Sequence, residues 1–201
     1  MPKDTFNNLS ADKKCRIFKA AVQEFSTRRF SDASINQIVK AAGIPRGSFY
    51  QYFDSKEDIY LYMSSEIAKE QKVAKSHIEP LNSDASAFDE FIYKAKVSLE
   101  LYRKRPQYRQ IALLIEKDDS EFITKLRSLS AENLNRVKEL FERDIQRGLI
   151  KPDVDSGLVI DMVYTLTMKE YFQAGLESDL FAKRMNEIIK IIKEGIACIR
   201  E

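Results

Sequence analysis

The sequence has few of the residues that would suggest an exported, metal-bound or membrane protein. Its 201 residues include two cysteines, Cys15 and Cys198, which lie at opposite ends of the chain. That separation argues against a disulfide framework or a thiolate metal site and is consistent with a reducing cytoplasm. No run approaches the roughly 18–20 apolar residues that span a bilayer, and the first residues hold no apolar stretch typical of a signal peptide. We therefore expect a cytoplasmic protein without membrane contacts.

Residues typical of catalysis are also scarce. The single histidine, His77, falls at the end of a predicted helix, and the chain has no glycine-rich loop that could cradle phosphates. Asp118, Asp119 and Glu121 form an acidic group, but acidic side chains near a helix N-terminus are ordinary partners of the helix dipole. No cluster has the spacing of metal ligands. The sequence therefore predicts that the protein is not an enzyme and that it uses no metal and no cofactor.

Positive charge is concentrated near the N-terminus. Residues 1–53 carry nine Lys and Arg against four Asp and Glu, whereas the remaining residues carry 24 against 27. A basic end on a chain whose formal net charge is +2 suggests a surface that meets a polyanion. An ordinary solvated face would show a similar surplus, so charge alone leaves both interpretations open.

Composition and periodicity favour an all-α fold. Six glycines and five prolines leave long stretches free of helix breakers, and apolar residues recur at helical spacing without period-2 alternation. In the first helix the apolar face comprises Cys15, Phe18, Val22 and Phe25, which makes Cys15 a small core residue. We predict nine helices, at residues 10–26, 34–42, 45–53, 56–77, 86–103, 106–116, 121–147, 155–174 and 180–199.

The second and third predicted helices have the layout of a helix-turn-helix. Ser34 and Gln37 form a capping-box pattern, in which each side chain bonds to an amide of the first turn. Gly43 can end the second helix in a left-handed conformation, and Pro45 can open the third at its first position, where no N–H is needed. Together with the first helix they give a compact three-helix module.

The third helix has an unusual composition for a purely structural element. Phe49 and Phe53, four residues apart, can anchor it to a core. Its other positions present hydrogen-bond donors and planar rings, which are the groups that reach base edges and phosphates in a major groove. Gly47 leaves room for a close backbone approach. A short surface helix with exposed tyrosines would have the same composition, so both interpretations stand at this point.

One part of the sequence resembles the TetR/AcrR family. The run GIPRGSFYQYF at residues 43–53, followed by SKED at 55–58, looks like the family's recognition helix and the start of its fourth helix. The runs AAVQEF at 20–25 and SI at 34–35 fit the same pattern. Pro45-Arg46 departs from the family, in which Ser-Lys is commoner, and this changes the expected sequence preference and not the fold.

The resemblance implies a domain division and a function. It implies a three-helix DNA-binding domain at residues 1–54 and a six-helix ligand-binding and dimerisation bundle at residues 55–201. The implied function is a ligand-responsive repressor that binds a palindromic double-stranded DNA operator as a homodimer and is released by a small-molecule inducer. Control of the same fold by a protein partner, or action as an activator, are the alternatives.

The resemblance also implies which residues contact DNA. Ser34 and Lys56 would hold phosphates, and Arg46 and Gln51 would read bases. The complete set is Ser34, Gln37, Arg46, Gly47, Ser48, Tyr50, Gln51, Tyr52 and Lys56.

In the larger domain the resemblance implies a dimer interface and a ligand cavity. The interface would use apolar stripes of the last two helices: Val159, Met162, Val163, Leu166, Met185, Ile188, Ile189, Ile192 and Ile196. The cavity would be lined by aromatic and methionine side chains: Tyr62, Phe88, Phe91, Tyr102, Tyr108, Phe122, Phe141, Tyr164, Met168 and Phe172. Residues with such spacing also form ordinary intramolecular cores, and that alternative stays open for both sets.

Overall fold

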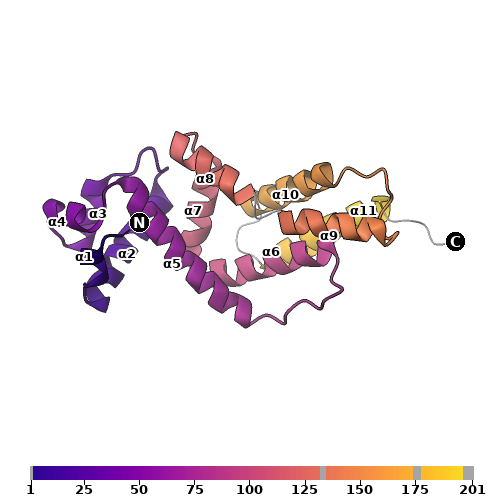
Figure 1. Cartoon of the computed structure of the whole chain (residues 1–201), viewed down its shortest axis with the longest axis horizontal. Helices are drawn as coiled ribbons and strands as arrows, with labels where there is room; N and C mark the ends of the chain where they lie inside the picture. Colours follow the sequence, from indigo (N-terminus) through magenta and orange to yellow (C-terminus); the bar gives the residue numbers. More distant parts are fainter. Residues whose placement is uncertain (1, 132–134, 174–177, 197–201) are drawn as a thin grey trace. The chain divides into compact units, whose positions relative to one another are not determined.

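The computed structural model describes residues 2–131, 135–173 and 178–196, in which all regular structure is helical, as predicted (Figure 1). The helices are α1 (Asp4–Asn7), α2 (Ala11–Thr27), α3 (Ile35–Ala42), α4 (Arg46–Tyr52), α5 (Lys56–Ser76), α6 (Ala87–Lys104), α7 (Pro106–Glu116), α8 (Glu121–Ala131), α9 (Asn135–Gln146), α10 (Ser156–Gln173) and α11 (Ser178–Ile196). Over these ranges no helix is long and apolar enough to cross a membrane.

The described residues contain eleven helices, two more than predicted. One addition is α1, a four-residue helix that precedes Ser10, whose hydroxyl accepts a hydrogen bond from the Lys13 amide and so starts α2. The predicted helix 121–147 corresponds to α8 and α9, on either side of residues 132–134, which lie outside the described residues. Gly148 adopts a left-handed φ of 66° just after α9, as expected for a helix end.

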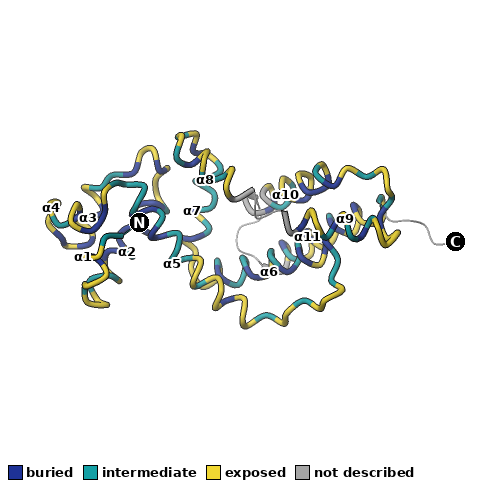
Figure 2. Tube along the Cα trace, viewed as in Figure 1, coloured by how far each residue is buried: buried dark blue, intermediate teal, exposed yellow. Residues whose placement is uncertain are grey.

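The buried face of α2 differs from the predicted one. Ile17 and Phe25 are each 1% exposed and Ala21 is fully buried, whereas Cys15 is exposed and Phe18 half-buried. Successive helical residues are about 100° apart, so Cys15 projects away from the direction of Ile17. The prediction of Cys15 as a core residue is therefore wrong. Figure 2 shows the same alternation of buried and exposed positions along the helices.

The chain divides into two compact units. The first comprises residues 1–74 and 104–128 and so contains α1 to α4, nearly all of α5, and α7. The core of this unit, against which the helix-turn-helix packs, consists largely of aromatic rings. The ring centroid of Phe30 lies 5.4 Å from that of Tyr60 and 4.5 Å from that of Phe122, which ties the turn after α2 to α5 and α8.

The compact units do not follow the predicted domains, 1–54 and 55–201. In the first unit α2 packs against both α3 and α7, so helices assigned to the regulatory domain share a core with the DNA-binding helices. The predicted domains, 1–54 and 55–201, divide the chain by function, and packing alone does not test a division by function. The two predicted domains therefore stay a prediction.

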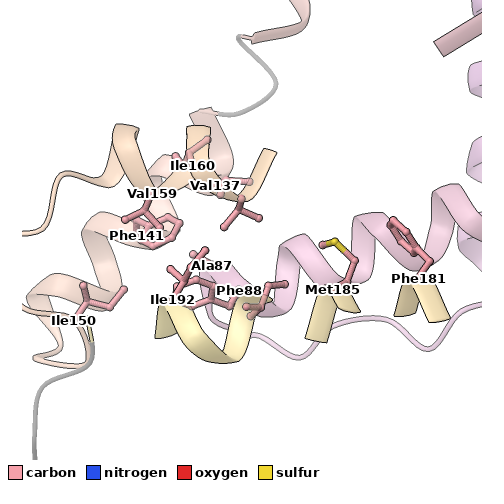
Figure 3. Close-up of a cluster of buried hydrophobic side chains, with 12 residues drawn as sticks. Ala87, Phe88, Val137, Phe141, Ile150, Val159, Ile160, Phe181, Met185 and Ile192 are labelled. Atoms are coloured by element: carbon pink, nitrogen blue, oxygen red, sulfur yellow. The ribbon is translucent and has the colours of Figure 1, made fainter. Parts of the chain in front are cut away.

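The second unit comprises residues 75–103 and 129–201 and contains nearly all of α6, with α9, α10 and α11. Its helices enclose a continuous apolar core (Figure 3). The rings of Phe88 and Phe141 meet edge-on with centroids 5.2 Å apart. The buried members of the core are Ala87, Phe88, Val137, Phe141, Ile150, Val159, Ile160, Val163, Phe181, Met185, Ile189 and Ile192.

This core takes up most of the side chains predicted to form a dimer interface. Five are buried in it and three more pack against it: Val159, Val163, Met185, Ile189, Ile192, Leu166, Ile188 and Ile196. Of the predicted set Met162 alone is exposed, at 44%. The interface assignment is wrong for the buried members, because α10 and α11 pack against each other within one chain and turn these stripes inward.

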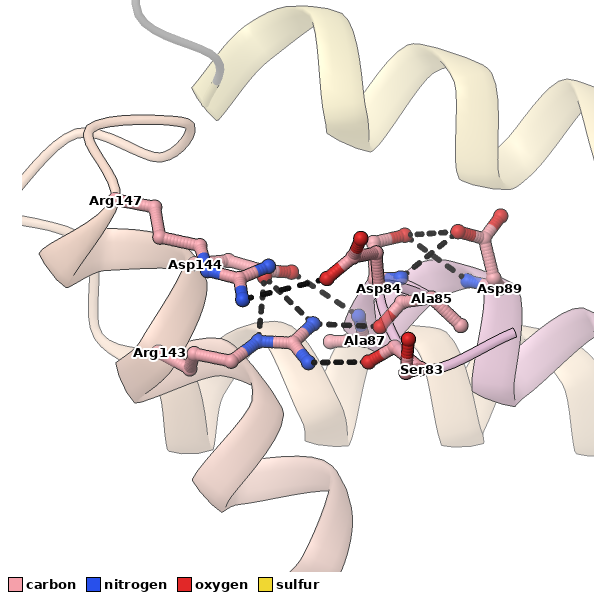
Figure 4. A network of polar contacts seen from close by, with 9 residues as sticks. Ser83, Asp84, Ala85, Ala87, Asp89, Arg143, Asp144 and Arg147 are labelled. Carbon is pink, nitrogen blue, oxygen red and sulfur yellow. Dashed lines mark hydrogen bonds and ion pairs between the residues drawn. The ribbon is translucent and has the colours of Figure 1, made fainter. Parts of the chain in front are cut away.

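A polar network ties the start of α6 to α9 (Figure 4). Asp144, 1% exposed, accepts hydrogen bonds from the Ala87 amide at 3.1 Å and from Arg143 Nη2 at 3.0 Å. The same guanidinium nitrogen donates to the carbonyl of Ala85. The carboxylate therefore satisfies an amide in the first turn of α6 from a position 57 residues away in the sequence.

Candidate nucleic-acid interface

The start of α3 is held by a side chain of α2. Ser34 is the N-cap residue but makes no side-chain cap hydrogen bond, so the predicted capping box with Gln37 is not formed. Instead Glu24, 8% exposed, accepts a hydrogen bond from the Ser34 amide at 2.8 Å and pairs with Arg28 at 3.7 Å. This carboxylate places negative charge at the N-terminus of α3, where the helix dipole favours it. The Gln37 side chain stays exposed.

The turn between α3 and α4 depends on Gly43. Its φ of 64° is left-handed, as predicted, and the Ile44 amide bonds to the Val39 carbonyl at 3.0 Å. A side chain at this φ would be strained. Pro45 is the N-cap of α4, with an extended ψ of 145°, and not its first helical residue as predicted. Its carbonyl already accepts the first turn's hydrogen bond, from Ser48 at 3.0 Å.

The helix α4 has an exposed polar face and is anchored to the core by buried aromatic side chains. Phe49 and Phe53 are both 0% exposed, with ring centroids 5.5 Å apart, which confirms the predicted anchor. A Cβ at Gly47 would meet no other part of the protein within 4 Å. The chain itself therefore does not require glycine there. Arg46, Gly47, Tyr50 and Gln51 are exposed, and Ser48 is half-buried.

Two residues of the predicted DNA-contacting set are engaged by the protein itself. Tyr52 is 6% exposed and its hydroxyl accepts a hydrogen bond from Lys13 Nζ at 2.9 Å, so the expectation that it faces outward is wrong. Lys56 Nζ donates to the carbonyls of Ser31 at 3.2 Å and Ala33 at 3.0 Å. An ammonium group has three N–H donors, and two of them hold the turn before α3. A phosphate contact of Lys56 stays a prediction.

Asp118 also holds this turn, a structural role that the sequence pattern did not predict. Its carboxylate is 1% exposed and accepts hydrogen bonds from the Ser31 and Ser120 amides, both at 2.9 Å. Burial by itself raises the pKa of Asp118, but hydrogen bonds from Ser120 and Ser31 lower it below its ordinary value. No local pattern could reveal the contact with Ser31, because the two residues are 87 positions apart.

The side chains predicted to line a ligand cavity fall in both compact units. In the first, the Tyr62 ring lies 4.7 Å from that of Phe6, and burial raises the pKa of Tyr62 to about 12. Tyr108 donates to Glu70 Oε1 at 2.9 Å. The others range from buried to exposed: Phe88 and Phe141 are buried, Phe91, Tyr102 and Phe122 half-buried, and Tyr164 exposed. The side chains of Met168 and Phe172 lie outside the described residues. A cavity shared by this set stays a prediction.

Comparison with known proteins decides the family. Residues 17–63, from α2 through the helix-turn-helix into α5, match the model of the bacterial regulatory proteins of the tetR family. A crystal structure of a TetR family regulator from Chloroflexus aurantiacus superposes with a TM-score of 0.73 at 28% identity, covering 99% of this chain and 100% of that one. The chain contains the DNA-binding domain of the TetR family. It is therefore a DNA-binding transcription regulator and not an enzyme.

The likeness to known regulators is higher over a short stretch than over the whole chain. The HTH-type regulator YdgC of Bacillus subtilis is 51% identical over 49 residues, which are 24% of this chain and only 25% of that protein. The fatty acid metabolism regulator protein of B. subtilis is 23% identical over 188 residues, 92% of this chain and 95% of that one. The structure of FadR from B. subtilis in complex with stearoyl-CoA has a TM-score of 0.69 at 20% identity, covering 91% and 99%.

Proposed function

We propose that this TetR-family regulator is a repressor that binds a palindromic operator as a homodimer and releases it when a small molecule binds. The observation that carries the proposal is the exposed face of α4, where Arg46, Tyr50 and Gln51 project from a helix anchored by two fully buried phenylalanines. Arginine and glutamine make bidentate contacts with guanine and adenine, and tyrosine hydroxyls reach phosphates. Ser34 and Gln37 at the start of α3, with Gly47, Ser48 and Lys56, complete the proposed DNA-contacting set.

A second copy of the chain is the proposed partner of the exposed apolar side chains of α10 and α11. Leu158 and Met162, four residues apart on α10, are 59% and 44% exposed. Leu180 and Ile191, eleven residues apart on α11, are 50% and 70% exposed. Residues four or eleven positions apart share a helix face, so each helix has an exposed stripe whose apolar residues point away from its own core; on α11 the stripe also holds the charged residues Arg184 and Glu187. Two-fold pairing through these stripes would give the protein the symmetry of a palindromic operator.

An effector that releases DNA must bind the state that cannot hold DNA more tightly than the state that can. The proposed moving part is α5, which follows the helix-turn-helix directly. Its Glu70 accepts hydrogen bonds from Arg105 Nε at 3.2 Å and from the Tyr108 hydroxyl at 2.9 Å, which links α5 to the start of α7. The B. subtilis FadR structure holds stearoyl-CoA, so long-chain acyl-CoA thioesters are the first compounds to screen.

The proposal is tested by titrating the protein onto the DNA upstream of its own gene and onto a scrambled duplex, at several salt concentrations. We expect a preference of about a thousandfold or more for the upstream DNA. Equal and strongly salt-dependent binding to both would show phosphate contacts only and would contradict operator binding at that site. Adding a long-chain acyl-CoA, with free coenzyme A as the control, then tests release by this ligand class.

The pairing face is tested by sedimentation of the variants Leu158→Lys and Ile191→Lys. We expect both to be monomeric at concentrations where the unmodified chain is a dimer, because a lysine would be desolvated in the interface. Val73→Lys on α5 is the matched control, since Val73 is also apolar and 60% exposed but lies outside the stripes. Dimers of unchanged stability in both stripe variants would rule out this face.

A further inference from the structure

The short helix α4 needs partners for its C-terminal backbone. It has seven residues, and a helix of this length is not stable through its own hydrogen bonds. The last four carbonyl groups of any helix have no partner inside it. In α4 the carbonyl of Phe49 accepts from the amide of Phe53 at 2.8 Å. The three carbonyls that follow all accept hydrogen bonds from the N-terminal segment of the chain.

Two residues of that segment provide all three donors. Lys3 Nζ donates to the Tyr50 carbonyl and the Lys3 amide to the Tyr52 carbonyl, both at 2.9 Å. The Thr5 hydroxyl donates to the Gln51 carbonyl. The Lys3 ammonium also lies at the negative end of the helix dipole, where a cation is favourable. The C-terminus of α4 is therefore capped from outside, by residues more than forty positions earlier in the sequence.

The segment is fixed in place by Phe6. This side chain is 2% exposed, and its ring centroid lies 5.0 Å from that of Phe53 and 4.7 Å from that of Tyr62. Farther along, the carbonyl of Asn7 accepts a hydrogen bond from Lys14 Nζ at 2.7 Å. The segment therefore joins the aromatic core shared by α4 and α5, and its donors are held in one geometry.

We propose that residues 3–9 form an N-terminal latch that sets the position of α4 for reading base edges. The inference rests on the proposed reading of DNA by α4. The latch bonds to the backbone of Tyr50 and Gln51, whose side chains face the DNA major groove in the proposed complex. It therefore fixes how far these two side chains extend toward the bases. Bidentate base contacts need closer geometry than contacts with phosphates. Loosening the latch therefore lowers the affinity for the operator more than the affinity for unrelated DNA.

Thr5→Val is the main test, because it removes one donor and keeps the shape and charge of the side chain. We expect the affinity for the operator to fall about fivefold, the effect of losing one hydrogen bond, and the affinity for a scrambled duplex to stay unchanged. Thr5→Ser keeps the hydroxyl and restores operator binding. Thr27→Val is the matched control: its hydroxyl bonds to the carbonyls of Gln23 and Glu24 within α2, and we expect no change in specificity.

Hydrogen exchange of the whole chain tests the latch without DNA. In Thr5→Val, and more strongly in Phe6→Ala, the amides of residues 46–53 exchange faster than in the unmodified chain, whereas those of α10 do not change. Unchanged exchange of residues 46–53 in both variants would overturn the latch. Equal loss of affinity for both duplexes in Thr5→Val, or no rescue by Thr5→Ser, would overturn its role in positioning. If the unmodified chain prefers no duplex, the proposed function fails, and the exchange comparison still decides whether the latch exists.

Discussion

Replacing Asp144 by alanine would show how strongly the polar network of the second unit holds α6. The side chain of Asp144 is 2% exposed and that of its partner Arg143 is 26% exposed. Alanine would leave the buried Ala87 amide without an acceptor and the guanidinium without its counter-charge. Removing one partner of a buried pair costs about 3–5 kcal/mol, and the partial exposure of Arg143 reduces the expected loss to about 2–4 kcal/mol. A typical domain has a free energy of unfolding of about 5–15 kcal/mol, so the variant should fold but be clearly weakened.

Thermal and urea unfolding followed by circular dichroism measure this loss. For a chain of this length, each kcal/mol lowers the Tm by about 2–4 °C, which gives a shift of about 4–16 °C. Asp144→Asn keeps an oxygen that can accept from Ala87 and should lose less. The matched control is Asp84→Ala, which removes an ion pair of the same network, with Arg147 at 3.5 Å, from a side chain that is 79% exposed. We expect that control to lose under about 1 kcal/mol. Equal losses in Asp144→Ala and Asp84→Ala would refute the argument from burial.

Three further predictions concern the DNA-binding unit. Arg46→Ala lowers operator affinity by about 1–3 kcal/mol, the value of a bidentate base contact, and an unchanged binding titration would remove Arg46 from base readout. Glu24→Ala leaves the Ser34 amide without its acceptor and lowers the free energy of unfolding by about 1–3 kcal/mol. Glu24→Gln keeps an acceptor and should lose less, so equal losses of the two variants in urea unfolding would contradict the capping role. Asp118 has a lowered pKa, so its ionised form contributes stability above its ordinary value of 3.8, and this contribution is lost as the pH falls through the lower folded value. The difference in unfolding free energy between the unmodified chain and Asp118→Asn should be constant above about pH 5 and shrink below pH 3.8; a constant difference at acid pH would contradict it.

The features that the sequence predicted correctly depend on neighbours within one helical turn. Gly43 follows α3 and has a positive φ, which a glycine tolerates without strain. Phe49 and Phe53 are four residues apart and both are buried, because that spacing places them on one face of a single turn. The helix-turn-helix could therefore be located from local patterns alone.

The choice of buried face could not be made in the same way for α10. Leu158 and Met162 share one stripe, and Val159 and Val163 share another that is only one residue away. Both stripes are apolar, so periodicity cannot say which one meets the core. Packing against α11 buries Val159 and Val163 and leaves Leu158 and Met162 exposed. The sequence therefore shows that this helix is apolar, but most of the residues predicted for the interface face inward.

Contacts between residues far apart in the sequence could not be predicted from local patterns. In the first unit these contacts all hold the ends of the two short helices α3 and α4 or the turn before them. The reading module consists of an eight-residue and a seven-residue helix, neither long enough to be stable alone. Glu24 holds the start of α3, Lys3 and Thr5 hold the end of α4, and Asp118 holds the turn before α3. Each of these groups comes from outside the two helices. The positions of α3 and α4 are therefore set by the surrounding structure. Because Asp118 lies in the turn between α7 and α8 and bonds to Ser31, a displacement of that turn would act directly on the helices that we propose read DNA.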